Sequence, residues 1–184
     1  MSRTYFKAFN LFVISFLITF SLSEAQAMLS WNEIMKGGEL SPKTEIFAWQ
    51  GISYGIESPK KGHPTIMIPG QYTYFDMAQS ETERGHRWAA IIDTERVYSF
   101  EPVPENDLSL DEQKLIKGVQ GALWSEYLDL PTRFMEYQSY PRITALSEIA
   151  WSKKEGKNWA DFYARLTNSH LQRLANMGVA FRDF

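Results

Sequence analysis

Cysteine is absent from the 184-residue chain, and this absence removes several kinds of chemistry at once. Disulfide bonds, thiolate nucleophiles and cysteine-ligated zinc are excluded. The three histidines, His63, His86 and His170, are too far apart in sequence to form a metal-binding pair on one helical turn. The 19 basic residues do not exceed the 22 acidic ones, so the basic excess typical of a nucleic-acid-binding surface is missing. We therefore expect no cofactor, no metal and no nucleic-acid partner.

Large aromatic residues, by contrast, are abundant. Six Trp, nine Tyr and twelve Phe make up 15% of the chain, beside a hydrophobic fraction of 44% and a charged fraction of 22%. The last two fractions are those of a globular protein, and the length fits a single domain. Trp and Tyr also suit flat apolar ligands that carry polar edges, such as sugar rings.

The first 27 residues have the pattern of a secretory signal peptide. Arg3 and Lys7 form a short positive start before an apolar run over residues 8–22, and Ala25-Gln26-Ala27 fits the small-x-small rule for cleavage. The run is short for a membrane span, which takes about 20 residues. The sequence thus predicts a cleaved signal peptide over residues 1–27 and a secreted or periplasmic protein, with a retained N-terminal membrane anchor as the alternative.

Short apolar segments alternate with helical patterns over the remaining residues, 28–184. We expect strands at 44–49, 64–68 and 118–124, and helices at 52–61, 110–116, 132–137, 141–151 and 158–176. Ser109 and Glu112 form a capping box at the start of one helix. Residues 97–100, ahead of two prolines, are expected to be a rigid connector. This alternation predicts an α/β fold with a parallel sheet.

Aromatic residues lie where the expected strands end. Trp49, Tyr74 and Trp124 stand at or just beyond the C-terminal ends of three strand segments. In a (β/α) barrel this end of the strands carries the active site. Trp151 and Trp159 fall instead on helices at core spacing, so we expect them to be packing residues.

Three stretches carry a resemblance to a known family. They are Met28–Ile34 (MLSWNEI), Trp49–Gly51 with Pro69–Asp76 (WQG with PGQYTYFD), and Gly118–Glu126 (GVQGALWSE). In order and spacing they resemble the C-terminal half of the catalytic barrel of the family-20 glycoside hydrolases, the β-N-acetylhexosaminidases and chitobiases. The resemblance covers nearly all of residues 28–184. It implies a (β/α)8 TIM-barrel fold, here an incomplete barrel of about four βα units resembling strands 5–8.

That family removes terminal β-linked N-acetylglucosamine or N-acetylgalactosamine with retention, and the substrate's own acetamido oxygen acts as the nucleophile. The resemblance therefore implies a glycan or chitooligosaccharide ending in N-acetylhexosamine as the ligand, with the sugar epimer left open. Trp31, Trp49 and Trp124 resemble the tryptophans that enclose the acetamido group and support the sugar. Trp88 resembles a further tryptophan at the rim.

Three polar residues match further ligand contacts of the family. Tyr74 resembles the tyrosine that donates a hydrogen bond to the acetamido carbonyl, and Asp76 and Glu126 resemble carboxylates that bind sugar hydroxyls. A phenol near the carbonyl oxygen orients it and stabilises developing charge. Carboxylates suit hydroxyl donors through charge-assisted hydrogen bonds. Arg142 and Glu148 are expected to form a structural ion pair.

The family's acid and its assisting aspartate, an adjacent Asp-Glu after a His-x-Gly-Gly signature, have no match here. The sole Asp-Glu in the chain is Asp111-Glu112, which lies in the capping box. A complete barrel takes about 250 residues. We therefore expect the chain to be inactive alone, as the product of a truncated hexosaminidase gene. Two alternatives are a non-catalytic amino-sugar-binding module that forms a homodimer, and a half-enzyme that needs a partner half-barrel from another chain.

Overall fold

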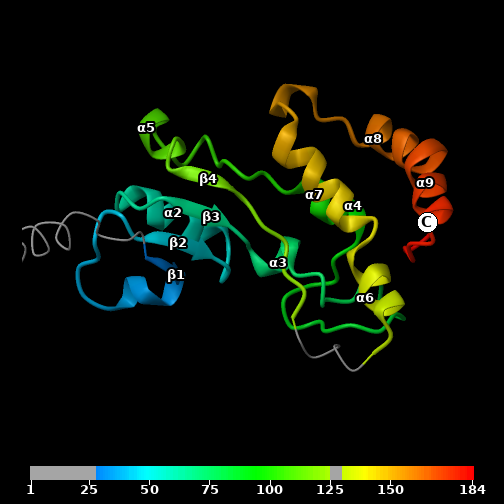
Figure 1. The fold of residues 1–184 in the computed structure, drawn as a ribbon. Helices are drawn as coiled ribbons and strands as arrows, with labels where there is room; N and C mark the ends of the chain where they lie inside the picture. The colour runs from blue at the N-terminus through cyan, green and yellow to red at the C-terminus, as the bar shows by residue number, and fades with distance from the viewer. Residues whose placement is uncertain (1–27, 125–129) are drawn as a thin grey trace, which may run out of the picture.

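The computed structural model describes residues 28–124 and 130–184. Within these residues, four parallel strands form one sheet in the order β1-β2-β3-β4 (Figure 1). The strands are β1 (Leu29–Trp31), β2 (Glu45–Ala48), β3 (Thr65–Met67) and β4 (Ile116–Val119). The expected α/β class with a parallel sheet is confirmed. The predicted signal peptide and Glu126 lie outside the described residues.

The register of the sheet brings the C-terminal ends of the strands to one edge. Ser30 pairs with Ile46, and Ile46 pairs in turn with Thr65, while a bulge lies between Thr65 and Ile66 where β3 meets β4. Ile46 and Ala48 of β2 are fully buried, as expected for a strand whose side chains alternate between two faces. This register carries the residues that follow each strand to a common surface.

The predicted strand at 118–124 is displaced, because β4 begins at Ile116 and ends at Val119. The following residues run beside the helix α3 (Gly70–Thr73) and the residues after it. The Ala122 N–H donates to the Thr73 carbonyl over 2.9 Å, and the Phe75 N–H donates to the Ala122 carbonyl over 2.6 Å. Beyond β4 the chain therefore runs alongside the residues that follow α3, where Ala122 forms an isolated parallel bridge with Tyr74.

Helical segments flank the sheet and continue beyond it. They are η1 (Asn32–Lys36), α2 (Ile52–Lys60), α3, α4 (Thr94–Ser99), α5 (Leu110–Gln113), α6 (Thr132–Ser139), α7 (Arg142–Trp151), η3 (Lys154–Gly156), α8 (Trp159–Arg165), η4 (Leu166–His170) and α9 (Leu171–Asn176). The helix expected at 158–176 is present, with the π-helical turn η4 between α8 and α9. The capping box at Ser109 is also present. None of the described helices is long and apolar enough to cross a membrane.

The connector expected at residues 97–100 is wrong, because this segment belongs largely to the helix α4. Asp93 caps that helix, and its Oδ1 accepts a hydrogen bond from the Arg96 N–H over 2.8 Å. Val97 and Tyr98 then face the core, where Tyr98 stacks on Phe162 of α8 at a centroid distance of 4.8 Å. This helix has only six residues, which are too few to show a helical spacing of apolar residues in the sequence.

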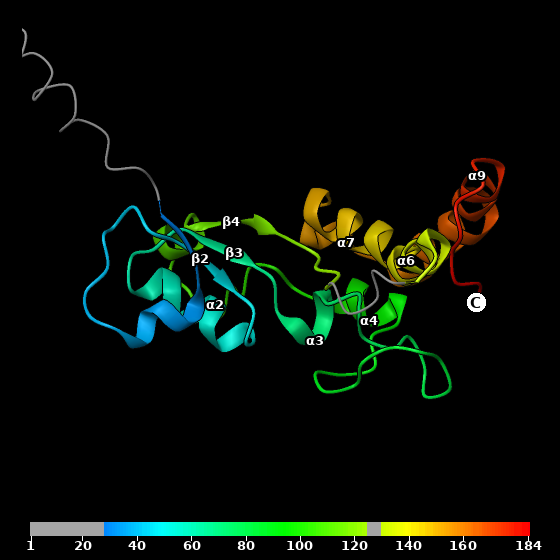
Figure 2. The same cartoon turned by 60° about the horizontal axis from the view of Figure 1, so that its bottom comes forward.

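The hydrophobic core lies between the sheet edge and the C-terminal helices. It joins Met67 of β3 and Phe75, which follows α3, to Leu146 of α7 and Leu174 of α9. Figures 1 and 2 show α2 beside the sheet and α3 between the sheet and the C-terminal helices, while α4 lies alongside α7. The sheet's edge strands, β1 and β4, have no second neighbour among the described strands.

Arg142 is fully buried and does not pair with Glu148, so the expected ion pair is wrong. Its guanidinium donates to the carbonyls of Phe75, Met77, Ile92 and Gln138. Glu148 instead binds Arg165 of α8 at 2.5 Å. Burial lowers the pKa of Arg142 to about 9, and the nearby Asp76 carboxylate opposes that shift, so the guanidinium is charged at neutral pH.

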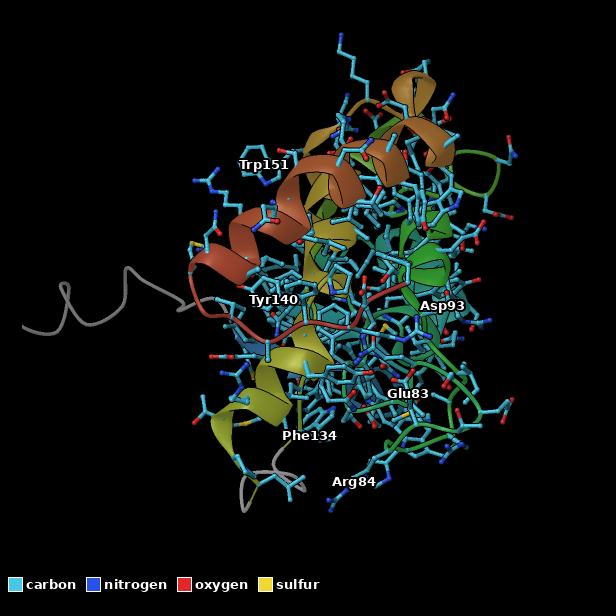
Figure 3. The ribbon with its side chains drawn as sticks, turned by 90° about the vertical axis from the view of Figure 1, so that its right-hand side faces the viewer. Glu83, Arg84, Asp93, Phe134, Tyr140 and Trp151 are labelled. Carbon is cyan, nitrogen blue, oxygen red and sulfur yellow. The ribbon has the colours of Figure 1, made fainter. Side chains whose placement is uncertain are left out.

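Trp151 and Glu83 differ in their surroundings: one side chain is exposed to solvent, and the other forms hydrogen bonds between elements. Trp151 is 90% exposed at the end of α7, so the expectation that it packs in the core is wrong (Figure 3). Glu83, labelled in the same view, accepts hydrogen bonds from Arg182 Nε at 2.8 Å and from the Tyr137 hydroxyl at 2.9 Å. These contacts connect the loop after α3 to α6 and to the C-terminal segment.

Candidate functional site

A pocket of about 510 Å³ lies at the C-terminal ends of the strands. Its walls are Trp31, Glu33, Trp49, Tyr74, Asp76, Trp88 and Trp124. Trp31 is the last residue of β1, and Trp49 directly follows β2. Tyr74 ends the short helix after β3, and Trp124 follows β4. Each strand therefore contributes one aromatic ring to the same hollow.

The rings form a continuous aromatic wall. Trp49 and Tyr74 lie nearly parallel, with centroids 6.1 Å apart and planes at 12°. Tyr74 meets Trp124 edge-on at 5.7 Å, and Trp124 in turn lies 5.8 Å from Trp31. Trp88 stands almost perpendicular to both Trp49 and Tyr74, with interplanar angles of 84° and 82°. Such a cage suits a small apolar group flanked by a sugar ring.

Trp88 occupies the rim of the pocket and is 62% exposed. It belongs to the loop that follows α3, in which Arg87 donates hydrogen bonds to the carbonyls of Glu81, Glu83 and Gly85. Gly85 has a φ of 151°, and a Cβ built there would lie 2.4 Å from the Ala78 nitrogen. The loop is therefore held by its own arginine and by a close backbone contact that requires glycine.

Tyr74 is almost fully buried at the back of the pocket. Burial raises its pKa to about 12, a hydrogen bond with the Trp124 side chain opposes that shift, and the carboxylates of Asp76 and Glu33 add to it. An indole N–H is a donor only, so the Trp124 ring donates to the phenol oxygen. The phenol therefore keeps its own proton at neutral pH and has it available for an acceptor in the pocket.

Two carboxylates also reach the pocket, one of them missed from the sequence. Asp76 is 1% exposed, and its backbone carbonyl accepts a hydrogen bond from the His86 N–H over 2.9 Å. Glu33 lies two residues after Trp31 in η1, and both of its oxygens lie 3.0 Å from the Trp49 indole nitrogen. Its place in the segment Met28–Ile34, beside a pocket tryptophan, is the sequence signal that could have identified it.

The structure thus brings together six of the seven residues proposed from the sequence: Trp31, Trp49, Tyr74, Asp76, Trp88 and Trp124. Glu126, the seventh, lies outside the described residues. Across residues 28–124 and 130–184, no three His, Asp or Glu side chains come together in a group that could hold a metal ion. The arrangement offers an apolar cage, a phenol donor and carboxylate acceptors.

Comparison with known families matches residues 3–154 to the catalytic domain of glycosyl hydrolase family 20. The chain belongs to this family. The family-20 match begins within the segment predicted as a signal peptide, and the assignment of that segment stays a prediction. The four parallel strands are accordingly part of a family-20 TIM-barrel domain.

Individual β-hexosaminidases are similar to this chain in sequence and in structure. A β-hexosaminidase of Porphyromonas gingivalis is 35% identical over 144 residues, covering 77% of this chain and 18% of that protein. A β-hexosaminidase of Vibrio furnissii is 38% identical over 130 residues, covering 68% of this chain and 21% of that protein. The crystal structure of a family-20 exo-β-N-acetylglucosaminidase from Vibrio harveyi, in complex with N-acetylglucosamine, matches with 34% identity and a TM-score of 0.78 over 86% of this chain and 25% of that one. The chain therefore spans about a fifth to a quarter of the length of these relatives.

Proposed function

We propose that residues 28–184 form the part of a β-N-acetylhexosaminidase active site that binds the acetamido group and the terminal sugar. The observation that carries this proposal is the aromatic pocket at the strand ends. The reaction is hydrolysis of a terminal β-linked N-acetylhexosamine by the substrate-assisted, retaining mechanism of the family. The ligand is a glycan or chitooligosaccharide with that sugar at its end. The Vibrio harveyi structure, which contains N-acetylglucosamine, supports the sugar class.

In this mechanism the pocket's rings would act by restricting the acetamido group. Trp31, Trp49 and Trp124 enclose an apolar volume in which a methyl group fits, and Trp88 closes the rim. Held there, the acetamido oxygen stays close to the anomeric carbon. Converting a mobile neighbouring group into a fixed one raises its effective concentration strongly.

Tyr74 would orient the reacting oxygen. Because the Trp124 indole donates to the Tyr74 oxygen, the phenol proton is left to the acetamido carbonyl. A pKa of about 12 keeps that proton in place across the physiological range. The donor is therefore set before the ligand arrives, which is the condition for electrostatic stabilisation without reorganisation. Asp76 and Glu126 would accept hydrogen bonds from sugar hydroxyls.

The group that protonates the leaving oxygen would come from elsewhere. Glu112 belongs to the capping box of α5 and Asp111 to the first turn of that helix, and neither residue lines the pocket. Loss of a general acid lowers the rate by a factor on the order of 10² to 10⁴. We therefore propose that this chain alone binds the sugar without turnover, and that a further half-barrel completes the enzyme.

The two edges of the sheet are consistent with a second half-barrel pairing with this one. β1 and β4 each lack a second neighbour among the described strands, and a hollow lined by Leu29, Phe47 and Gln120 lies on the sheet between them. Unpaired strand edges are ready to pair with further strands. A homodimer that forms a self-completed amino-sugar-binding module is the second candidate, favoured by the exposed Leu29 side chain on β1. Secretion through the segment 1–27 remains part of the proposal.

The test is calorimetric binding of the thiazoline analogue of the oxazolinium intermediate to the full chain. We expect saturable binding that Trp124→Ala weakens at least tenfold. Trp151→Ala, which removes an exposed tryptophan far along α7, should leave it unchanged. Glucose, which lacks the acetamido group, should compete poorly.

The outcomes separate the two candidates. An unchanged affinity in the Trp124 variant, or no binding by the unaltered chain, refutes the sugar pocket. Hydrolysis of an aryl β-N-acetylglucosaminide by the pure chain refutes the proposed absence of an acid. A stable dimer in sedimentation favours the binding module, whereas a monomer that gains activity with a partner half-barrel favours the half-enzyme.

A further inference from the structure

Glu33 reaches across the pocket wall to the Trp49 indole. Both carboxylate oxygens accept from Trp49 Nε1–H at 3.0 Å, and Oε1 also accepts from Gln50 Nε2 at 3.3 Å. An indole has a single donor, so this contact uses the only hydrogen bond that the Trp49 side chain can make. Bonds to an ionised acceptor are shorter and stronger than neutral ones.

Packing alone does not fix the Trp49 ring. Trp49 lines the 510 Å³ sugar pocket, and it also lines a second hollow of about 440 Å³ together with Lys36 and Gln71. Trp49 is only half-buried, because its side chain packs against the core but also borders both open volumes. Its aromatic neighbours, Tyr74 and Trp88, lie about 6 Å away by ring centroid. The bond to Glu33 therefore supplies a directional restraint that the surroundings do not.

Glu33 is in turn held by its neighbours. Asn32, fully buried, donates from Nδ2 to the Gln50 side-chain oxygen at 2.7 Å. The Asn32 Oδ1 accepts from the backbone N–H groups of Trp49 and Gln50 at 3.1 and 3.3 Å. Gln50 then donates to Glu33. These bonds tie η1 to the residues after β2, so the carboxylate is presented to the indole in a defined place.

We propose that Glu33 is a positioning residue of the sugar pocket, which holds the Trp49 ring in the orientation that encloses the acetamido group. This inference rests on the proposed function of the same pocket. Glu33 acts through the indole N–H rather than by touching the ligand. Losing the acceptor would let the ring turn toward the second hollow and open the cage.

The experiment is a double-mutant cycle on binding of the thiazoline analogue to the full chain. Glu33→Ala is expected to weaken binding about five- to tenfold, somewhat less than the loss of more than about tenfold that is typical of a bond to a charged group, because Glu33 is exposed. Glu33→Gln keeps an acceptor oxygen and should stay within about threefold of the unaltered chain. Glu39→Ala removes another exposed glutamate close in sequence and serves as the matched control.

Trp49→Phe decides whether Glu33 works through the indole. Phenylalanine keeps an aromatic wall but has no N–H, so Glu33→Ala should cause no further loss in that background. The proposal is overturned if Glu33→Ala binds like the unaltered chain, if Glu33→Gln is as weak as Glu33→Ala, or if the Glu33 effect persists in the Trp49→Phe background.

A second measurement needs no ligand. The indole N–H resonance of Trp49, identified by its loss in Trp49→Phe, should exchange with solvent faster in Glu33→Ala than in the unaltered chain. An unchanged exchange rate refutes the restraint itself. Absence of thiazoline binding by the unaltered chain refutes the proposed function instead, so the two failures give different results.

Discussion

Replacing Arg142 by methionine is expected to destabilise the fold by about 4 kcal/mol. The buried guanidinium serves four backbone carbonyls, those of Phe75, Met77, Ile92 and Gln138. Methionine fills a similar volume but donates nothing. A buried carbonyl left without a donor costs about 1–3 kcal/mol, and relief from burying a charge offsets part of the total. A loss of about 1 kcal/mol for each acceptor is therefore a low estimate.

The measurement is urea unfolding followed by circular dichroism, with Arg173→Met on the exposed face of α9 as the control for loss of a positive charge. The control should remain within about 0.5 kcal/mol of the unaltered chain. The carbonyls of Phe75 and Met77 flank Asp76, so the variant should also bind the thiazoline analogue more weakly. A change in unfolding free energy below 1 kcal/mol for Arg142→Met would falsify the account of this residue as the tie between α6, α7 and the pocket segment.

Three other changes have defined outcomes. Burial acts to raise the pKa of Glu83, but hydrogen bonds led by Arg182 lower it overall, so the stability that this carboxylate contributes is present above the ordinary carboxyl pKa and is lost as the pH falls through the lowered value. Glu83→Gln should cost about 1 kcal/mol at pH 7 and converge with the unaltered chain in acid, in thermal unfolding at several pH values; a constant difference contradicts this. Gly85→Ala should lower the affinity for the thiazoline analogue, because its Cβ would lie 2.4 Å from the Ala78 nitrogen and displace the loop that carries the rim tryptophan; equal affinity argues against the loop's role. Ser109→Ala removes the acceptor of the capping box and should cost about 1 kcal/mol in urea unfolding without altering binding, and reduced binding would link α5 to the pocket.

The parts of the fold that could be predicted are those set by local chemistry. The capping box at Ser109 and the strands around Ile46 and Ile66 follow from residues adjacent in sequence. The helix α4 was missed because its single Asp93 cap opens only six helical residues, too few to show a periodic pattern. The strand predicted at 118–124 was displaced because its continuation pairs with α3 and the residues after it, a partner that no local pattern identifies.

The candidate site could be predicted through its aromatic residues but not through its supports. Family resemblance identified the tryptophans, and the structure gathers them in one pocket. Glu33 was missed because its role depends on a hydrogen bond with the indole of Trp49, which lies 16 residues further along the chain. Arg142 was assigned the wrong partner because every residue has a backbone carbonyl, so the sequence does not indicate which carbonyls a buried guanidinium will bind.

Trp49 and Trp88 line both the pocket at the strand ends and the hollow beside Lys36. If a ligand on one side ordered these indoles, the free energy of binding on the other side would change, and the effect would be equal in both directions. Occupancy of the polar hollow beside Lys36 would then tune the affinity of the sugar pocket without contacting the sugar. Two side chains that separate neighbouring volumes would in this way link the two binding equilibria.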